Sequence, residues 1–408
     1  MMKKYQIILA ALLCLANFAR AQRLSLDSVI ARIANNPALQ AFDAKAKAQD
    51  AYSTGAKSLD APRIAAGQYM TPYRPDPNMG SFMIQAEQMF TNPAKLRAKE
   101  AYMKGLSKVT AADKNYLKNQ LFAQARQYYY ERVVLEKKLT LLQHTQDLLE
   151  YVLKDANIRL TYNKERLPNI YKARAALFEL DNTREQLNNE ISQKNILLNT
   201  LMDRDQQIAF TIDTNIDLKD YELKVTDTAD LASARSDIKA ISRNIDLQQL
   251  NAQMEYSKRK PDFGLQAGHM FTYGGNSNQY ILMASVTIPI VPWASKEYKA
   301  NIKGIRYEVE ELQQQKRDIL NQAQGQLASL RTAMGSKKRQ LNNYDQHIIP
   351  ALQNSYKTAL LAYDQNTGDL PSVLNSINDL QAARMTALDL LQEVLILQVA
   401  YEKENESN

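Results

Sequence analysis

The sequence contains few of the residues on which compact, chemically active domains depend. It has one cysteine, Cys14, one tryptophan, and only 12 glycines and 12 prolines among 408 residues. The three histidines, His144, His269 and His347, are far apart in the sequence, and no HExxH, CxxC, GxSxG or glycine-rich phosphate loop occurs. A single cysteine excludes an internal disulfide. We therefore predict that the protein is not an enzyme and needs no cofactor.

The first 21 residues have the pattern of a secretory signal peptide. Lys3 and Lys4 precede an apolar stretch at 7–16, and Ala19-Arg20-Ala21 has the small-x-small pattern of a cleavage site. The apolar stretch is shorter than the ~20 residues that a membrane-spanning helix needs. We expect residues 1–21 to be removed together with Cys14. The alternatives are an uncleaved membrane anchor and a lipid anchor at Cys14.

The charge balance makes no case for a nucleic-acid partner. The formal net charge is +7, and three of the basic residues lie in the first 21 residues, which hold no acidic residue. Basic and acidic residues alternate through the rest of the chain, as they do on solvated helices. We predict no nucleic-acid binding.

Breakers of regular structure are missing over long stretches. No glycine lies between Gly105 and Gly264, and Pro168 is the only proline between Pro93 and Pro261. This predicts very long helices, at 94–156 and 169–202 as one antiparallel pair and at 294–361 and 371–401 as a second. Apolar residues at three and four spacing indicate coiled-coil-like packing. Pro350 is expected to kink or interrupt its helix.

Two short regions have the alternation of β-strands. Residues 263–273 and 280–288 alternate apolar with small or polar side chains, and 63–71 with 81–89 form a weaker copy. Ten such residues cross a bilayer when tilted, but four strands cannot close a barrel, and open sheet edges cannot lie in lipid. The hairpins therefore belong either to a soluble protein or to a barrel shared by several chains. The signal peptide and the aromatic residues near the strand ends favour the shared barrel, namely Tyr69, Phe271, Tyr273 and Tyr280.

Landmarks of the first half recur in the second. Pro62 and Pro261 are 199 residues apart, whereas Leu167-Pro168 and Leu370-Pro371 are 203 apart. A period this long indicates a duplicated domain-sized half. We predict a first repeat at 22–203, with a β-hairpin at about 62–90 and a helical hairpin at about 94–202. An inter-repeat linker at 204–230 precedes a second repeat at 231–408, with a β-hairpin at about 261–290 and a helical hairpin at about 294–401.

This order of elements resembles the TolC family of outer-membrane efflux channels. The helix starts Asn36-Pro37-Ala38-Leu39 and Arg235-Ser236-Asp237-Ile238 are similar to those of the family, as are Val286 to Ile290 and Ala362-Tyr363 followed by Gly368 and Leu370-Pro371. Glu87 to Phe90, followed by Asn92 to Leu96, resembles the strand-exit motif of the heavy-metal resistance branch. The sequence departs from the family pattern where Ser236 replaces a proline and where Glu165 occupies the position of Gly368.

The resemblance implies a mainly α fold with a small β part. It implies a homotrimer in which duplicated helical hairpins form a periplasmic tunnel and two β-hairpins per chain form a 12-stranded β-barrel in outer-membrane lipid. It also implies a passive export duct for metal cations or small toxic compounds, with a periplasmic adaptor and an inner-membrane pump as partners. The alternative is a soluble periplasmic coiled-coil scaffold or adaptor.

The two helical turns are the candidate gate and adaptor contact. Glu165, Asp364 and Asp369 could form carboxylate rings in a trimer, or could be turn and capping residues. Lys164 and Arg166 suit salt bridges with Glu165, or a solvated charge cluster. The full candidate set is Leu160, Thr161, Tyr162, Lys164, Glu165, Arg166, Pro168, Tyr363, Asp364, Gly368, Asp369 and Pro371.

No metal site is predicted. His144 and His347 occupy matching repeat positions and could form a ring in a trimer, but they are also ordinary polar residues on a helix flank. Met79, Met83 and Met89 cluster near the first hairpin, where methionine packs against strands or lipid more often than it binds a soft metal.

Overall fold

The computed structural model describes residues 22–74, 76–221 and 227–406. The expected signal peptide with Cys14, and residues 222–226 of the expected linker, lie outside this description. The chain divides into two compact units. One comprises the segment ending at Leu39 together with 117–235 and 322–408, and the other comprises 40–116 and 236–321. Each unit therefore combines segments from both halves of the sequence.

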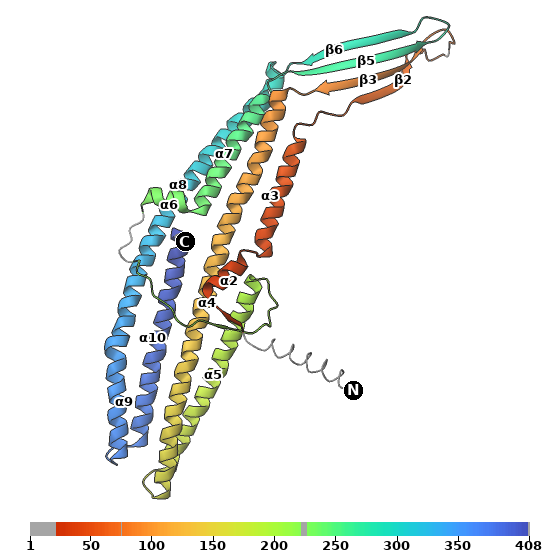
Figure 1. Cartoon of the computed structure of the whole chain (residues 1–408). Coiled ribbons are helices and arrows are strands. Elements are labelled where there is room, and N and C mark those ends of the chain that lie inside the picture. The colour runs from red at the N-terminus through yellow and green to blue at the C-terminus, as the bar shows by residue number, and fades with distance from the viewer. Residues whose placement is uncertain (1–21, 75, 222–226, 407–408) are drawn as a thin grey trace, which may run out of the picture. The chain divides into compact units, whose positions relative to one another are not determined.

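Long helices dominate the structure, as the scarcity of breakers predicts (Figure 1). In the first half, α4 (Pro93–Thr161) is followed by α5 (Leu167–Leu201). In the second half, α8 (Pro292–Asn343) leads through a short π-helix (Tyr344–Ile348) into α9 (Ile349–Asp364), and α10 (Leu370–Asn405) follows. The shorter helices are α2 (Leu26–Ile33), α3 (Pro37–Gly55), α6 (Thr228–Ala234) and α7 (Ser236–Ser257).

The interruption expected at Pro350 is confirmed. Proline has no backbone N–H, so its position in a helix leaves a carbonyl one turn earlier without its usual donor. Here the chain adopts five residues of π-helix just before the proline, and the N–H of Ile349 bonds to the carbonyl of Tyr344, five residues back. The π-helix includes His347, whose predicted counterpart His144 lies in a regular stretch of α4.

Two groups of buried side chains stabilise the first unit. One joins the C-terminal part of α4 and the N-terminal part of α5 to α9 and α10. In it, Leu142, Leu149, Ile170 and Leu370 are almost inaccessible to solvent. The other surrounds a two-stranded parallel sheet formed by β1 (Gln22–Leu24) and β4 (Phe210–Ile212). This sheet could not be predicted from the sequence pattern, because segments of three residues are too short to show an alternation.

The second unit contains a four-stranded antiparallel sheet. Its strands are β2 (Arg63–Tyr69), β3 (Ser81–Phe90), β5 (Asp262–Thr272) and β6 (Gln279–Thr287), in the order β2-β3-β5-β6. The predicted strands are confirmed, with small differences at their ends. The predicted apolar face is also confirmed, because the register places Phe263 opposite Val286 and Ala267 opposite Leu282. Side chains of this face are about half exposed, including Phe263, Leu265, Phe271 and Leu282.

The opposite face of the sheet is polar and lined by small residues and methionine. Arg63 pairs with Glu87, and the side chain of Gln266 donates a hydrogen bond to Gln85 at 2.8 Å. Met89 and Ser285 lie so close over Gly264 that a Cβ at this position would be 2.3 Å from the Ser285 hydroxyl. The two faces thus differ in the way expected for a sheet between an apolar and an aqueous phase. Among the described helices, none has an apolar stretch of the length and low charge that crossing a membrane requires.

Candidate functional site

The candidate gate residues occupy two turns of the first unit and the helix ends beside them. The first turn is 162–166, between α4 and α5, and the second is 365–369, between α9 and α10. Both turns are shorter than the gaps at 157–168 and 362–370 that the predicted helices left between them. Proline is tolerated at the first helical positions, where no intrahelical N–H bond is needed, so Pro168 and Pro371 begin helices instead of preceding them.

Both turns have the same backbone conformation. Each contains an asparagine in the left-handed region, Asn163 with φ 61° and Asn366 with φ 58°. The next N–H reaches back five residues along the chain in the same way, from Lys164 to the carbonyl of Arg159 and from Thr367 to that of Ala362, at 2.9 and 2.8 Å. Asparagine is favoured at this helix end because its short polar side chain tolerates a positive φ.

Arg159, which the sequence analysis did not select, connects the first turn to the second. Its Nε donates to Asp155 at 2.6 Å, and one terminal nitrogen donates to the Tyr363 carbonyl and the Asn366 side chain at 3.0 and 2.9 Å. The other terminal nitrogen lies 3.5 Å from Asp364. The guanidinium also lies 4.4 Å from the centre of the Tyr363 ring. The i, i+4 pairing with Asp155 near a helix end is the one sequence signal for this residue.

A second link runs in the opposite direction, from Tyr363 to Glu165. The Tyr363 hydroxyl donates to Glu165 Oε2 at 3.0 Å, while Glu165 Oε1 accepts from the Arg166 N–H and the Asn169 side chain. Tyr363 is 3% exposed. Burial, together with this hydrogen bond to a carboxylate, raises the pKa of Tyr363 far above its ordinary value, so the phenol remains a donor.

Salt bridges to Glu165 were one of the two alternatives for Lys164 and Arg166, and none is found among the described residues. Within the part of the chain that the structure describes, neither Lys164 nor Arg166 forms an ion pair, and Glu165 takes neutral donors instead. Both cations are exposed. The solvated alternative is the observed one.

Asp369 is a helix cap. Its carboxylate accepts from the N–H of Ser372 at 3.1 Å and from the Ser372 hydroxyl at 2.5 Å, and these bonds lower the pKa of Asp369. At the matching place in the first turn, Arg166 makes no side-chain cap. Gly368 does not have a positive φ, but a Cβ there would lie 3.1 to 3.2 Å from Ala362 and the Tyr363 nitrogen. Close packing therefore explains this glycine.

A polar groove of about 450 Å³ lies between the two turns, lined by residues of both. Large apolar side chains are exposed at helical spacing from the last turns of α4 into the first turn, and again along the first turns of α5, so that each set shares a face. They are Tyr151, Ile158 and Tyr162 on one side and Leu167, Tyr171 and Phe178 on the other, with exposed fractions of 47% to 72%. Of these six, only Tyr162 belongs to the candidate set predicted from the sequence.

The other weighed residues lie apart from the turns. His144 and His347 are exposed on helix flanks, and no group of three or more potential His, Cys, Asp or Glu ligands occurs among the described residues. Met79 lies exposed in the loop before β3. Met83 stands opposite Met270, and Met89 opposite Gly264, on the polar face of the sheet.

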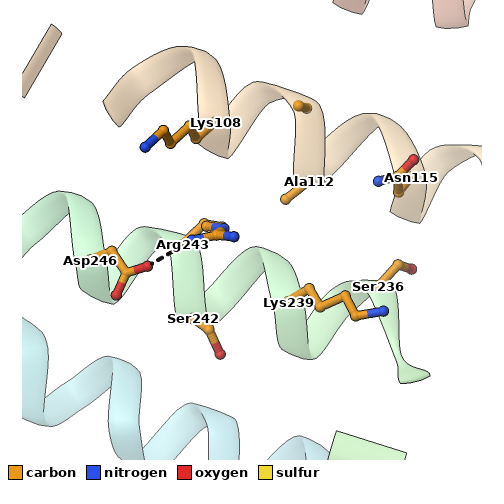
Figure 2. Close-up of a pocket in the computed structure, with 9 residues that line it drawn as sticks. Lys108, Ala112, Asn115, Ser236, Lys239, Ser242, Arg243 and Asp246 are labelled. Carbon is orange, nitrogen blue, oxygen red and sulfur yellow. Dashed lines mark hydrogen bonds and ion pairs between the residues drawn. The ribbon is translucent and has the colours of Figure 1, made fainter. Parts of the chain in front are cut away.

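A basic groove between α4 and α7 was not anticipated either. Figure 2 shows Lys108 and Asn115 on α4 facing Lys239 and Arg243 on α7, around a space of about 570 Å³. Arg243 pairs with Asp246 at 3.2 Å, which leaves the lining rich in amino, amide and hydroxyl groups. Lys108 and Lys239 lie in separate helical stretches without a distinguishing pattern, so this groove could not be predicted from the order of residues.

Comparison with solved structures identifies the fold. The chain matches the outer-membrane channel OprN with a TM-score of 0.75 and 15% identity, covering 94% of this chain and 90% of that one. It matches a crystal structure of CusC with a TM-score of 0.75 and 14% identity over 95% of both chains. The CusC structures concern the conformational changes that accompany folding and transmembrane channel formation. The open-state MtrE outer membrane channel of Neisseria gonorrhoeae matches with a TM-score of 0.73 and 13% identity, over 93% of this chain and 88% of that one.

No family model and no curated protein sequence matches the chain. The structural similarity nevertheless extends over nearly the whole length of each protein, and it includes both the long helices and the small sheet. The chain therefore has the fold of these outer-membrane channels, which confirms the resemblance to the TolC family at the level of the fold.

Proposed function

We propose that this chain is the outer-membrane channel subunit of a tripartite efflux system and acts as a passive duct from the periplasm to the exterior. The observation that carries the proposal is the four-stranded sheet with one apolar and one polar face, on a chain with the fold of outer-membrane channels. This mechanism does not require the chain itself to supply energy. An inner-membrane pump would supply the energy, and a periplasmic adaptor would connect the two.

The sheet supports a barrel shared by three chains. Among the described strands, β2 and β6 each pair on one side only, so each sheet has two open edges. Open edges cannot face hydrocarbon, because every backbone donor and acceptor needs a partner there. Three copies would supply twelve strands and join β6 of one copy to β2 of the next. The face with Phe263 and Leu282 would then meet lipid, and the face with Gln85 and Glu87 would line water.

The long helices would continue the pore as a periplasmic tunnel, which requires export of the chain through the signal peptide expected at residues 1–21.

The second part of this proposal is that the halves arose by duplication, with repeats at 22–203 and 231–408. Pro93 and Pro292, which begin α4 and α8, are 199 residues apart, and Thr161 and Asp364, which end α4 and α9, are 203 apart. The shared conformation of Asn163 and Asn366 supports the same origin.

The two turns would form the periplasmic gate and the adaptor contact. Arg159 and Tyr363 tie one turn to the other, so opening would require these bonds to break or rearrange. Exposed Tyr162, Leu167 and Tyr171 supply the apolar surface that a partner hairpin could cover. Because Asp369 caps α10 and Asp364 faces Arg159, we propose that these carboxylates act mainly by holding the turns in place.

The proposed cargo is metal cations or small toxic compounds, and the strand-exit sequence from Glu87 to Leu96 supports the metal branch. Deletion of the gene, followed by measurement of tolerance to metals, dyes and antibiotics, tests this assignment. Unchanged tolerance to all three would reject it.

Extraction of washed membranes tests the channel itself. An integral trimer should remain in the membrane after carbonate or urea treatment and should migrate on gels as a heat-sensitive trimer. Release of the chain as a water-soluble monomer would instead favour the periplasmic scaffold.

A further inference from the structure

A groove of about 620 Å³ lies between the end of α7 and the first turns of α8, within the second unit. Tyrosines and cations make up most of its lining, with Glu310 as the single acidic residue. Within the described chain, none of the four lining cations takes part in an ion pair. These cations are Arg259, Lys299, Lys303 and Arg306.

The cations on α8 are unfavourable for the helix itself. Lys296, Lys299, Lys303 and Arg306 are exposed and follow one another at spacings of three and four, so they share one face and repel one another. Lys296 follows the first turn of α8, where the helix dipole favours negative charge and no acidic residue is present, and the other three lie beyond the range of the dipole. Helix stability therefore does not explain this stripe, whereas a bound anion would neutralise it.

Arg259 is different, because it follows the C-terminal end of α7, where the dipole favours cations. It stacks on Tyr256, with its guanidinium 3.8 Å from the ring centre. Stacking leaves the edge of the planar guanidinium, with its N–H donors, available for an anion.

Apolar side chains lie beside the basic stripe, where the sheet passes into α8. Ile288, Ile290 and Trp293 are 55%, 64% and 80% exposed. Trp is enriched at membrane–water interfaces, because its ring is apolar and its N–H is polar. Lys296 and Lys299 follow Trp293 by three and six residues, about 5 and 9 Å along a helix, and the headgroup layer is about 5 to 7 Å thick. Their long side chains can therefore reach headgroup phosphates.

The other end of the sheet has no such charge. The loops at 70–80 and 273–278 together contain one basic and one acidic residue, Arg74 and Asp76. The asymmetry places the positive charge only where the strands pass into helices, the end that the proposed function assigns to the periplasm.

We propose that the groove between α7 and α8 binds the phosphates of anionic phospholipid headgroups at the periplasmic side of the membrane. This rests on the proposed function, which places the sheet in lipid. Trp293 and Ile290 contact the boundary of the acyl chains, while Arg259 and Lys299 contact the headgroups. Lys303 and Arg306 lie about 15 and 20 Å along α8 from Trp293 and extend the positive surface on the aqueous side. The site fixes the height of the channel in the bilayer.

The single tryptophan makes a direct test possible, because all tryptophan fluorescence comes from Trp293. The full chain is reconstituted in bilayers that contain brominated phosphatidylglycerol or brominated phosphatidylcholine, and the quenching of Trp293 gives the relative affinity of the two lipids. We expect preferential quenching by phosphatidylglycerol. Since each cation near an anionic surface strengthens binding about fivefold, the triple variant K299Q/K303Q/R306Q should reduce the preference about fivefold or more.

The matched control is K154Q/K172Q/R174Q, which also removes two lysines and one arginine, but from exposed positions of α4 and α5. It should keep the wild-type preference. If the first variant does not fold, the wild type decides the question, because the preference must fall as salt screens the charges.

Three results would overturn the proposal: equal quenching by both lipids, an equal loss in both triple variants, or displacement of phosphatidylglycerol by excess inorganic phosphate, which would identify a free ion as the ligand. Dissociation of the trimer in the α8 variant, with lipid preference unchanged, would assign the cations to a second copy and also reject it. Failure of the channel proposal is distinct, since it would appear as a water-soluble monomer.

Discussion

The two turns of the first unit have the same backbone but divide the chemistry between them. Where the first turn has long charged side chains, Arg159 and Glu165, the equivalent positions of the second, 203 residues later, have the small residues Ala362 and Gly368. The second turn contributes instead a buried tyrosine, an asparagine side chain and a backbone carbonyl. The difference shows how two copies of a duplicated element can bind each other. One copy carries the long side chains that form the contacts, and the other has small residues at the equivalent positions.

The largest effect is expected from Arg159→Ala. The change removes bonds to Tyr363, Asn366 and Asp155 at once, and hydrogen bonds from charged donors contribute about 1.5 to 3 kcal/mol each before relaxation. We expect the free energy of local opening of both turns to fall by about 2 to 4 kcal/mol. Hydrogen–deuterium exchange of peptides covering 155–170 and 360–375 measures it. In planar bilayers the variant should also conduct more in the absence of partners.

Arg166→Ala is the control for this change, since Arg166 is exposed and forms no ion pair in the described chain. Equal exchange in the two variants would show that the link through Arg159 does not hold the turns together.

Tyr363→Phe is expected to have a smaller effect. It removes only the hydroxyl that donates to Glu165 and preserves the ring below the Arg159 guanidinium. The local opening free energy should fall by about 1 to 2 kcal/mol, because the carboxylate loses one of three donors. Tyr162→Phe, at a 72% exposed position, is the matched control and should change little. A double-mutant cycle with Glu165→Gln isolates the pair, and additive effects would mean that the bond contributes nothing.

The caps of α5 and α10 offer a reciprocal exchange. Asp369→Ala should destabilise the start of α10 by about 1 kcal/mol, whereas Arg166→Ser should stabilise the uncapped start of α5 by up to about 1 kcal/mol. The pH dependence follows from the lowered pKa of Asp369. Its contribution is complete above the ordinary value of 3.8 and is lost as the pH falls through the lower folded-state pKa. Exchange near Ser372 that is insensitive to acid in the wild type would contradict this role.

The smallest effects concern the left-handed asparagines. Asn163→Gly and Asn366→Gly both supply a residue that accepts a positive φ, so the backbone terms should be similar and within a few tenths of a kcal/mol of zero. Asn366→Gly also removes a bond from Arg159, so it should cost about 1 kcal/mol more. In an Arg159→Ala background that excess should vanish. If it persists in local hydrogen exchange, the asymmetry has another source.

The features of this protein that could be predicted were those that depend on residues close together in the sequence. The long runs without glycine or proline predicted α4, α5 and α10, and the alternation at 263–273 predicted both β5 and its apolar face. Capping chemistry could be foreseen as one role of Asp369, because a short acidic residue before Leu-Pro suits a helix start. These signals depend on local geometry, which the chain carries with it wherever it folds.

The candidate site could be located but not assembled from the sequence. Lys164 and Arg166 are the neighbours of Glu165 along the chain, yet Glu165 bonds to Tyr363, which lies 198 positions away. Arg159 was missed because its partners beyond its own helix come from the second turn. Long side chains choose partners by distance in space, which the order of residues does not specify.

By itself, the sequence predicted the long helices, the four strands of the two hairpins and which strand face is apolar, since periodicity, breakers and caps act over a few residues. Only the tertiary structure decided that the two hairpins join through β3 and β5, that β1 pairs with β4, and that Arg159 and Tyr363 connect the turns. The reason is that these contacts bring together backbone or side-chain groups far apart in the chain, and their geometry is set by the packing of whole helices and strands.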